Sequence, residues 1–230
     1  MRLLLTSNGL TNQSIKDALV ELAQKPAGDF HVVFIPTAAN PENGTGNNDK
    51  SWLLNYFDEA KSLHPKVLDI IDLAVANNDW EARIKPADVI IVGGGNTFYL
   101  SYWMQKSGFM DALPELVKTK VYVGISAGSM IVTPTLKVTS QAINKLDTIK
   151  DEELDQLGPA GESSAATASL VPFAVRPHFG APHRGTITKD FLETVAQAIN
   201  LPIYAIDDQS AVKVTDENIE VVSEGTWAHL

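Results

Sequence analysis

Short apolar runs alternate with longer amphipathic stretches along most of the chain. The runs are mostly β-branched and most end at Gly, Pro or Ser, which is typical of strands buried on both faces of a parallel sheet. They occupy residues 3–5, 32–35, 67–71, 89–92 and 121–125. The amphipathic stretches predict helices over 12–23, 50–62, 77–84, 96–118 and 185–199. This alternation predicts an α/β domain with a parallel sheet.

The later part of the chain departs from this alternation. Residues 136–170 contain a charged segment and then a run of small residues, with too few large apolar side chains for a core of their own. We therefore expect 136–170 to cover the site partly, within a single domain that spans 1–230. Further strands are predicted over 203–206, 211–214 and 219–222, the last two as a hairpin.

The composition excludes several classes of protein. Ten more acidic than basic residues give a net charge of −10, which disfavours binding to nucleic acid. The absence of cysteine excludes disulfides, thiolate zinc sites and a cysteine nucleophile. No stretch approaches the roughly 18 apolar residues of a membrane span, and the run at 3–5 is too short for a signal peptide. We expect a soluble, cytoplasmic protein without a membrane partner.

Residues 124–128, Gly-Ile-Ser-Ala-Gly, follow an apolar strand and match the G-x-S-x-G pattern of a nucleophile elbow. A sharp turn there lifts the Ser126 hydroxyl out of the backbone and aims the Ala127 N–H at an oxyanion. The segment 93–97, Gly-Gly-Gly-Asn-Thr, ends another strand and offers a second donor, the Gly95 N–H. Its alternative interpretation is a strand-to-helix turn capped by Asn96 or Thr97.

A serine nucleophile needs a base and a group that orients it. Of the five histidines, His178 follows a rigid proline at a predicted strand end, whereas His183 lies in a softer loop and is expected to touch substrate or solvent. Arg176 also allows His178 to be only a hydrogen-bonding loop residue. Asp207 and Asp208 follow a third strand, and only one of them is expected to face the histidine.

The combination of these segments resembles the peptidase E family of serine dipeptidases, which includes aspartyl dipeptidases. The matching segments are 3–8, 34–38, 90–98, 124–128, 134–135 and 177–179. The resemblance implies a mostly parallel sheet with helices on both faces, related to class I glutamine amidotransferases. It implies Ser126 as nucleophile, His178 as base and then acid, and Gly95 and Ala127 as oxyanion donors. The family's late Glu matches Asp208, which is one methylene shorter, so either the strand end lies closer to the histidine or the site works mainly as a Ser–His dyad.

The resemblance also implies a short peptide as substrate, with an N-terminal aspartate read by a basic residue after the histidine. That position falls near Thr188, so Arg184 or Arg176 is the candidate replacement, and Asn96, Thr97 and His183 are further candidates for substrate binding. No cofactor is expected. No metal site is expected either, because Pro182 and the surrounding loop disfavour joint ligation by the two nearby histidines.

Other functions remain open on the same residues. An esterase, an amidase or a cyanophycinase-like hydrolase would use the same serine and histidine. Two departures from the family pattern suggest a catalytically inactive binding protein: Asp208 stands where the family has Glu, and no arginine stands near Thr188. In α/β-hydrolases the chain order is serine, acid, histidine. That order would require His229, the penultimate residue, as base after Asp207 or Asp208.

Overall fold

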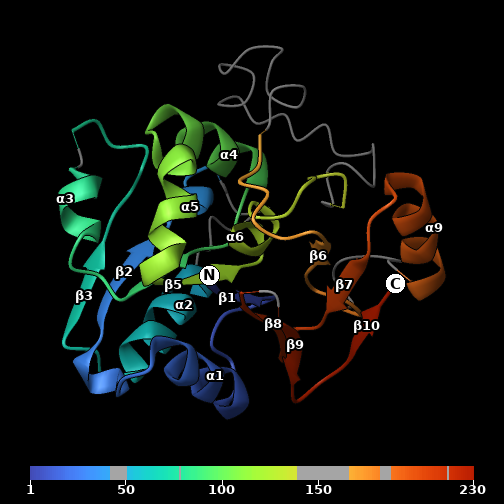
Figure 1. The fold of residues 1–230 in the computed structure, drawn as a ribbon, viewed down its shortest axis with the longest axis horizontal. Coiled ribbons are helices and arrows are strands. Elements are labelled where there is room, and N and C mark those ends of the chain that lie inside the picture. Colours follow the sequence, from blue (N-terminus) through green and yellow to red (C-terminus); the bar gives the residue numbers. More distant parts are fainter. Residues whose placement is uncertain (42–50, 78, 139–165, 182–187, 217) are drawn as a thin grey trace.

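A computed structural model describes residues 1–41, 51–77, 79–138, 166–181, 188–216 and 218–230 (Figure 1). The larger sheet contains β1 (Arg2–Thr6), β2 (His31–Ile35), β3 (Val67–Ile70), β4 (Val89–Val92), β5 (Val121–Ile125), β8 (Ser210–Thr215) and β9 (Asn218–Ser223). The smaller sheet contains β6 (Ala174–Arg176), β7 (Ile203–Ile206) and β10 (Trp227–His229). The helices are α1 (Gln13–Ala23), α2 (Ser51–Ser62), α3 (Trp80–Ile84), α4 (Thr97–Lys106), α5 (Phe109–Thr119), α6 (Ala127–Met130) and α9 (Lys189–Ile199), with 3₁₀ turns at Ala27–Asp29 and Thr37–Ala39.

The larger sheet has the strand order β3-β2-β4-β5-β1-β8-β9. Its first five strands are parallel, whereas β8 and β9 are antiparallel to their neighbours and form the predicted hairpin. The α/β class with a mostly parallel sheet is therefore confirmed, and the sheet as a whole is mixed. The carboxyl ends of β1, β4 and β5 lie side by side at one edge, where the glycine segment and the elbow begin.

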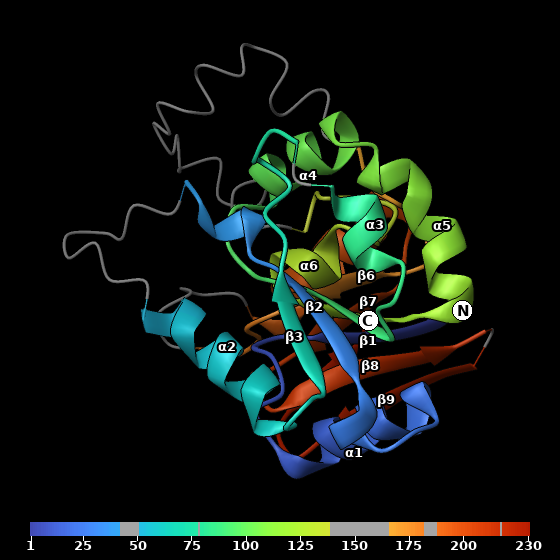
Figure 2. The same cartoon turned by 90° about the vertical axis from the view of Figure 1, so that its left-hand side faces the viewer.

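Helices cover both faces of this sheet, because each inner strand is apolar on both sides. Along β1, Leu3 and Leu5 pack in one core with α3, α4, α5 and α6, whereas Leu4 packs in a second core with α1 and α2. The same alternation divides β2 and β4. Figures 1 and 2 show α1 and α2 together on one side of the strands and α4 and α5 on the other. No helix in the described ranges is long and apolar enough to cross a membrane.

The smaller sheet was not predicted as a separate unit. In it β6 and β7 are parallel, and β10 pairs antiparallel with β7. Its side chains, Val175, Ile203 and Ile206 among them, belong to the same core as Leu3 and Leu5 of the larger sheet. The two sheets therefore share one core, with α9 packed on the smaller one (Figure 1).

The single helix predicted over 96–118 is wrong, because two helices occupy this stretch. Gly108 separates α4 from α5 and has φ 76°, in the left-handed region that favours glycine. Its N–H donates to the carbonyl of Gln105, which closes the end of α4 with a tight turn. The periodicity of apolar residues continues across the break, so hydrophobic pattern alone did not reveal it.

One expectation falls largely on residues that the structure does not describe. Of the predicted cover at 136–170, residues 139–165 lie outside the described ranges.

The break between α4 and α5 leads to a stability prediction. A Cβ at Gly108 would meet no atom within 4 Å, so Gly108→Ala should cost only the left-handed backbone strain, about 1–2 kcal/mol of unfolding free energy. Gly28→Ala is the matched control, since its nearest contact would be an ordinary 3.9 Å and its φ is not in that region. Urea unfolding compares the variants. A Gly108→Ala protein as stable as the control would contradict the strain argument.

Candidate active site

The end of β1 holds the turn that follows β5. Leu5 and Thr6 lie opposite Gly124 and Ile125 in the parallel register. The Thr6 carbonyl accepts the Ser126 N–H at 3.0 Å and the Ser129 hydroxyl at 2.7 Å, and the Thr6 hydroxyl donates to the Gly124 carbonyl at 2.8 Å. Both sides of the turn are therefore fixed to one neighbouring residue.

Ser126 occupies a strained backbone conformation, with φ 50° and ψ −104°. The flanking glycines make this turn possible because other backbone passes against them. A Cβ at Gly124 would lie 2.6 Å from the Gly128 carbonyl oxygen, and a Cβ at Gly128 would lie 2.1 Å from that of Val92. The glycines of the motif are thus required by close approach, and the turn is the predicted elbow between strand and helix.

The structure brings Ser126, His178 and Asp208 into one hydrogen-bonded chain. Ser126 Oγ lies 3.0 Å from His178 Nε2, and His178 Nδ1 lies 2.7 Å from Asp208 Oδ1. Because a carboxylate only accepts, Nδ1 carries the proton in the neutral ring and Nε2 accepts from the serine hydroxyl. This arrangement suits removal of the Ser126 proton by the imidazole.

Asp208, and not Asp207, faces the histidine. Asp207 Oδ1 accepts from the Gln209 N–H and the Ser210 hydroxyl, and its Oδ2 accepts from the Thr226 N–H. These bonds close the turn after β7 and fix the approach to β10. The two adjacent carboxylates therefore point in different directions, and Asp207 acts as the turn-forming residue.

Three backbone N–H groups beside Ser126 donate to no group within the described part of the chain: those of Gly94, Gly95 and Ala127. The glycine segment lies directly against the serine, since a Cβ at Gly94 would be 3.2 Å from the Ser126 Cβ. Preorganised N–H groups of this kind stabilise negative charge on an oxygen near the nucleophile.

Asn96 and Thr97 form the start of α4. The Asn96 side-chain oxygen accepts the N–H groups of Phe98 and Tyr99, both at 3.0 Å, and so caps α4. Both Asn96 and Thr97 are buried. This is the alternative interpretation of the segment, in which these side chains end a strand-to-helix turn.

The basic residues around His178 have different surroundings. Arg176 is 2% exposed and donates from Nη1 to the Val138 carbonyl, so its guanidinium has almost no surface to offer a substrate. His183 and Arg184 lie outside the described residues. Thr188, near which the resemblance expects a basic residue, caps α9 by accepting the Phe191 N–H.

His229 lies on β10, and its ring stacks on that of Tyr204 with the ring centroids 4.4 Å apart. The position next to Ser126 Oγ is taken by His178. The residue order of α/β-hydrolases therefore finds no support in this arrangement.

Ser7 is the site residue that the sequence analysis missed. It follows β1 and is fully buried, and its hydroxyl donates to Asp208 Oδ1 at 2.7 Å and accepts the His178 N–H at 2.8 Å. The available signal was its place at the end of the strand next to β5. The sequence analysis considered only a nucleophile, a base and an acid, and therefore not a second hydrogen-bond donor to Asp208.

A cavity of about 400 Å³ adjoins this region through Asn8, the residue after Ser7. The Tyr56 hydroxyl donates to the Asn8 side-chain oxygen at 3.1 Å, and Glu59 Oε2 accepts the Leu10 N–H at 2.7 Å. Helix α2 therefore supports the loop that carries Ser7. Across the described ranges, no three His, Asp or Glu side chains gather as metal ligands.

Comparison with known proteins identifies relatives over most of the chain. The model for peptidase family S51 matches residues 3–222. Peptidase E from Streptomyces coelicolor is 28% identical over 139 residues, 58% of this chain and 51% of that protein, so the match spans about half of that relative. The Drosophila melanogaster protein named "Probable alpha-aspartyl dipeptidase" is 29% identical over 200 residues, 84% of this chain and 72% of that protein.

A solved structure shares the fold. A crystal structure of a peptidase from an acI-B1 Actinobacterium matches with a TM-score of 0.60 and covers 100% of this chain and 93% of its own. Its sequence is 16% identical, so this likeness speaks for the fold alone.

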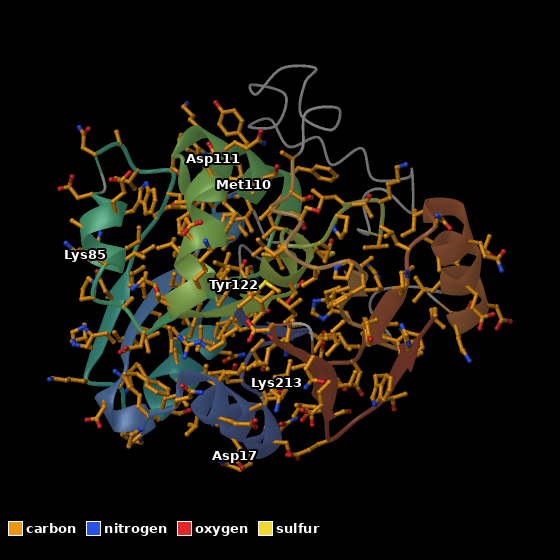
Figure 3. The ribbon with its side chains drawn as sticks, viewed as in Figure 1. Asp17, Lys85, Met110, Asp111, Tyr122 and Lys213 are labelled. Atoms are coloured by element: carbon orange, nitrogen blue, oxygen red, sulfur yellow. The ribbon has the colours of Figure 1, made fainter. Side chains whose placement is uncertain are left out.

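The first prediction from the site concerns the support of the elbow by Tyr122. This side chain, labelled in Figure 3 in the interior of the molecule, is fully buried. Its hydroxyl donates to the Gly128 carbonyl at 2.7 Å. Burial raises the pKa of the phenol far above its usual range, so the hydroxyl stays protonated and keeps donating. Tyr122→Phe leaves a buried carbonyl without its donor and should lower the unfolding free energy by about 1–3 kcal/mol.

Chemical denaturation measures this effect, with Tyr102→Phe as control. The Tyr102 hydroxyl accepts from Lys106 at the exposed surface, so its loss should change stability by less than about 0.5 kcal/mol. Equal effects of the two substitutions would contradict a special role for the buried bond.

The second prediction concerns Glu59. Burial raises the pKa of its carboxyl, against the lowering effects of the Leu10 N–H and Lys16. The folded protein therefore keeps this proton to higher pH than the unfolded chain, so the group costs stability as the pH rises above the ordinary glutamate value of about 4.3. Glu59→Gln should become increasingly more stable than the parent between about pH 4 and pH 7.

Unfolding in urea at several pH values gives this difference directly. Asp58→Asn, one residue earlier and exposed, serves as the matched control on the same helix. A Glu59→Gln protein whose stability relative to the parent does not change with pH would contradict the burial argument.

Proposed function

Because the chain belongs to peptidase family S51, a family of serine peptidases, we propose that it is a dipeptidase that forms an acyl-enzyme on Ser126. The proposed substrates are short peptides, those with an N-terminal aspartate first among them. The observation that carries the proposal is the contact chain from Ser126 Oγ to His178 Nε2, and from His178 Nδ1 to Asp208.

The proposed acylation begins as Ser126 Oγ attacks the peptide carbonyl carbon and its proton passes to His178 Nε2. Asp208 accepts the Nδ1–H and stabilises the imidazolium that forms. The carbonyl oxygen becomes an oxyanion and accepts the N–H groups of Gly95 and Ala127, whose lack of partners in the described part of the chain supports this role. When the C–N bond breaks, Nε2–H protonates the leaving amine.

Deacylation repeats these steps with water. Water gives a proton to His178 Nε2 and attacks the ester carbon, and the same two N–H groups stabilise the second oxyanion. Breakage of the C–Oγ bond returns the proton from Nε2 to Ser126 and releases the carboxylic acid. No step requires a metal or a cofactor.

For aspartate recognition we propose Arg184. An arginine binds a carboxylate through two parallel N–H groups, which gives both charge and geometry. Arg176 is buried on the Val138 carbonyl and Thr188 caps α9, so neither supports this role. The name of the Drosophila relative, which mentions alpha-aspartyl dipeptidase, supports aspartate as the first residue to test.

We also propose a relationship of the fold to class I glutamine amidotransferases, with serine in place of their cysteine. The elbow directly after β5, held by the neighbouring β1, supports it. Asp208 Oδ1 lies 2.7 Å from His178 Nδ1, so the shorter acid still reaches the imidazole. This contact favours an active enzyme over a catalytically inactive binding protein. A cytoplasmic location stays a prediction.

The test is amine release from X-Leu dipeptides, where X is Asp, Glu, Asn or Ala. We expect Asp-Leu to be cleaved fastest and Ser126→Ala to lose at least about a thousandfold in kcat. Arg184→Gln should lower kcat/KM for Asp-Leu by about ten- to a hundredfold and leave Ala-Leu unchanged, with Lys189→Gln as the matched loss of a nearby charge.

The other outcomes separate the alternatives. Preference for a residue other than aspartate keeps the dipeptidase mechanism and removes aspartate recognition. Cleavage of a matched ester without any dipeptide would favour an esterase. Tight dipeptide binding without turnover would overturn the proposed function.

A further inference from the structure

We propose that Ser7 is a positioning residue that holds Asp208 and His178 in their working arrangement. The inference deepens the proposed function and rests on it for its catalytic consequence, while its geometric part stands alone. Ser7 is 0% exposed, so its hydroxyl cannot touch a substrate and acts only through its two polar neighbours.

The two short hydrogen bonds of the Ser7 hydroxyl have only one possible direction, and its third contact, with His178 Nδ1, is longer at 3.5 Å. The His178 N–H at 2.8 Å is a donor, so Ser7 Oγ accepts there. Asp208 Oδ1 at 2.7 Å is an acceptor, so the hydroxyl hydrogen goes to the carboxylate. One hydroxyl therefore links the backbone of the base to the side chain of the acid.

Asp208 Oδ1 receives two donors from this arrangement. The first is His178 Nδ1–H at 2.7 Å and the second is the Ser7 hydroxyl at the same distance. The Asp208 side chain is 34% exposed, against 12% for His178, so water competes for the carboxylate. The terminal torsion of an aspartate is broad, and a second fixed donor restricts its rotation.

The histidine needs a comparable restraint on its backbone. His178 has φ 60°, in the left-handed region that a side chain rarely adopts, and its N–H bond to Ser7 fixes that conformation. The same loop also holds the acid by its backbone, because the Thr11 hydroxyl donates to the Asp208 carbonyl at 2.8 Å. Residues 7–11 thus position both partners of Ser126.

The first readout is kinetic. Ser7→Ala should lower kcat by about ten- to a hundredfold, the effect of one hydrogen bond to a charged group, and leave KM within about twofold. In an Asp208→Ala background, Ser7→Ala should have a clearly smaller effect, because only its bond to the His178 N–H remains to be lost. Ser101→Ala removes an equally buried hydroxyl, bonded to the Ala166 carbonyl, and should not change kcat.

The assay uses the best X-Leu dipeptide of the parent, or p-nitrophenyl acetate if no dipeptide is cleaved. Thermal unfolding of each variant shows that it is folded. Equal fold losses from Ser7→Ala with and without Asp208 would overturn the positioning role. So would a change confined to KM.

The second readout does not depend on activity. The His178 Nδ1 proton, bonded to a carboxylate, should give a downfield ¹H NMR resonance in the parent that is absent from His178→Ala. In Ser7→Ala this resonance should shift or be lost through faster exchange with water, whereas Ser101→Ala should retain it unchanged. An unaltered resonance in Ser7→Ala, or none in the parent, would overturn the inference even if the proposed function fails.

Discussion

The parallel pairing of β1 with β5 is the constraint on which the site depends. It puts the Thr6 carbonyl where it accepts both the Ser126 N–H and the Ser129 hydroxyl, and these bonds hold the serine in a conformation that a free chain rarely adopts. The close approach of Gly128 to Val92 on β4 brings the neighbouring strand into the same arrangement. The backbone strain at Ser126 is thus balanced by a rigid, buried strand edge.

The candidate site also lies where the two sheets meet. Ser7 and Ser126 follow strands of the larger sheet, whereas His178 and Asp208 follow β6 and β7 of the smaller one. The contacts that suit proton transfer are therefore also contacts between the sheets. The apolar core that the two sheets share fixes their relative position. Packing far from Ser126 therefore affects the distances between Ser126, His178 and Asp208.

Sequence patterns predicted the features that depend on neighbouring residues in the chain, namely the strands and the elbow. The β-branched runs identified the strands, although β3 lies at the sheet edge and is not buried as predicted. The Gly-x-Ser-x-Gly segment at a strand end identified the elbow, because close backbone approach requires those glycines. The choice between Asp207 and Asp208 needed the turn after β7, which no periodicity encodes. The break at Gly108 was hidden by apolar spacing that continues through it. Ser7 was invisible because its role comes from a contact between residues 201 positions apart in the chain.

The central claim is that Ser126 is a nucleophile activated by His178. Its most direct measurement is the reaction with a fluorophosphonate, followed by mass spectrometry of the intact protein and of its peptides. The account predicts one adduct per chain, located on Ser126, forming at least about a hundredfold more slowly in His178→Ala. An adduct on another residue, or equal rates in the two proteins, would contradict it.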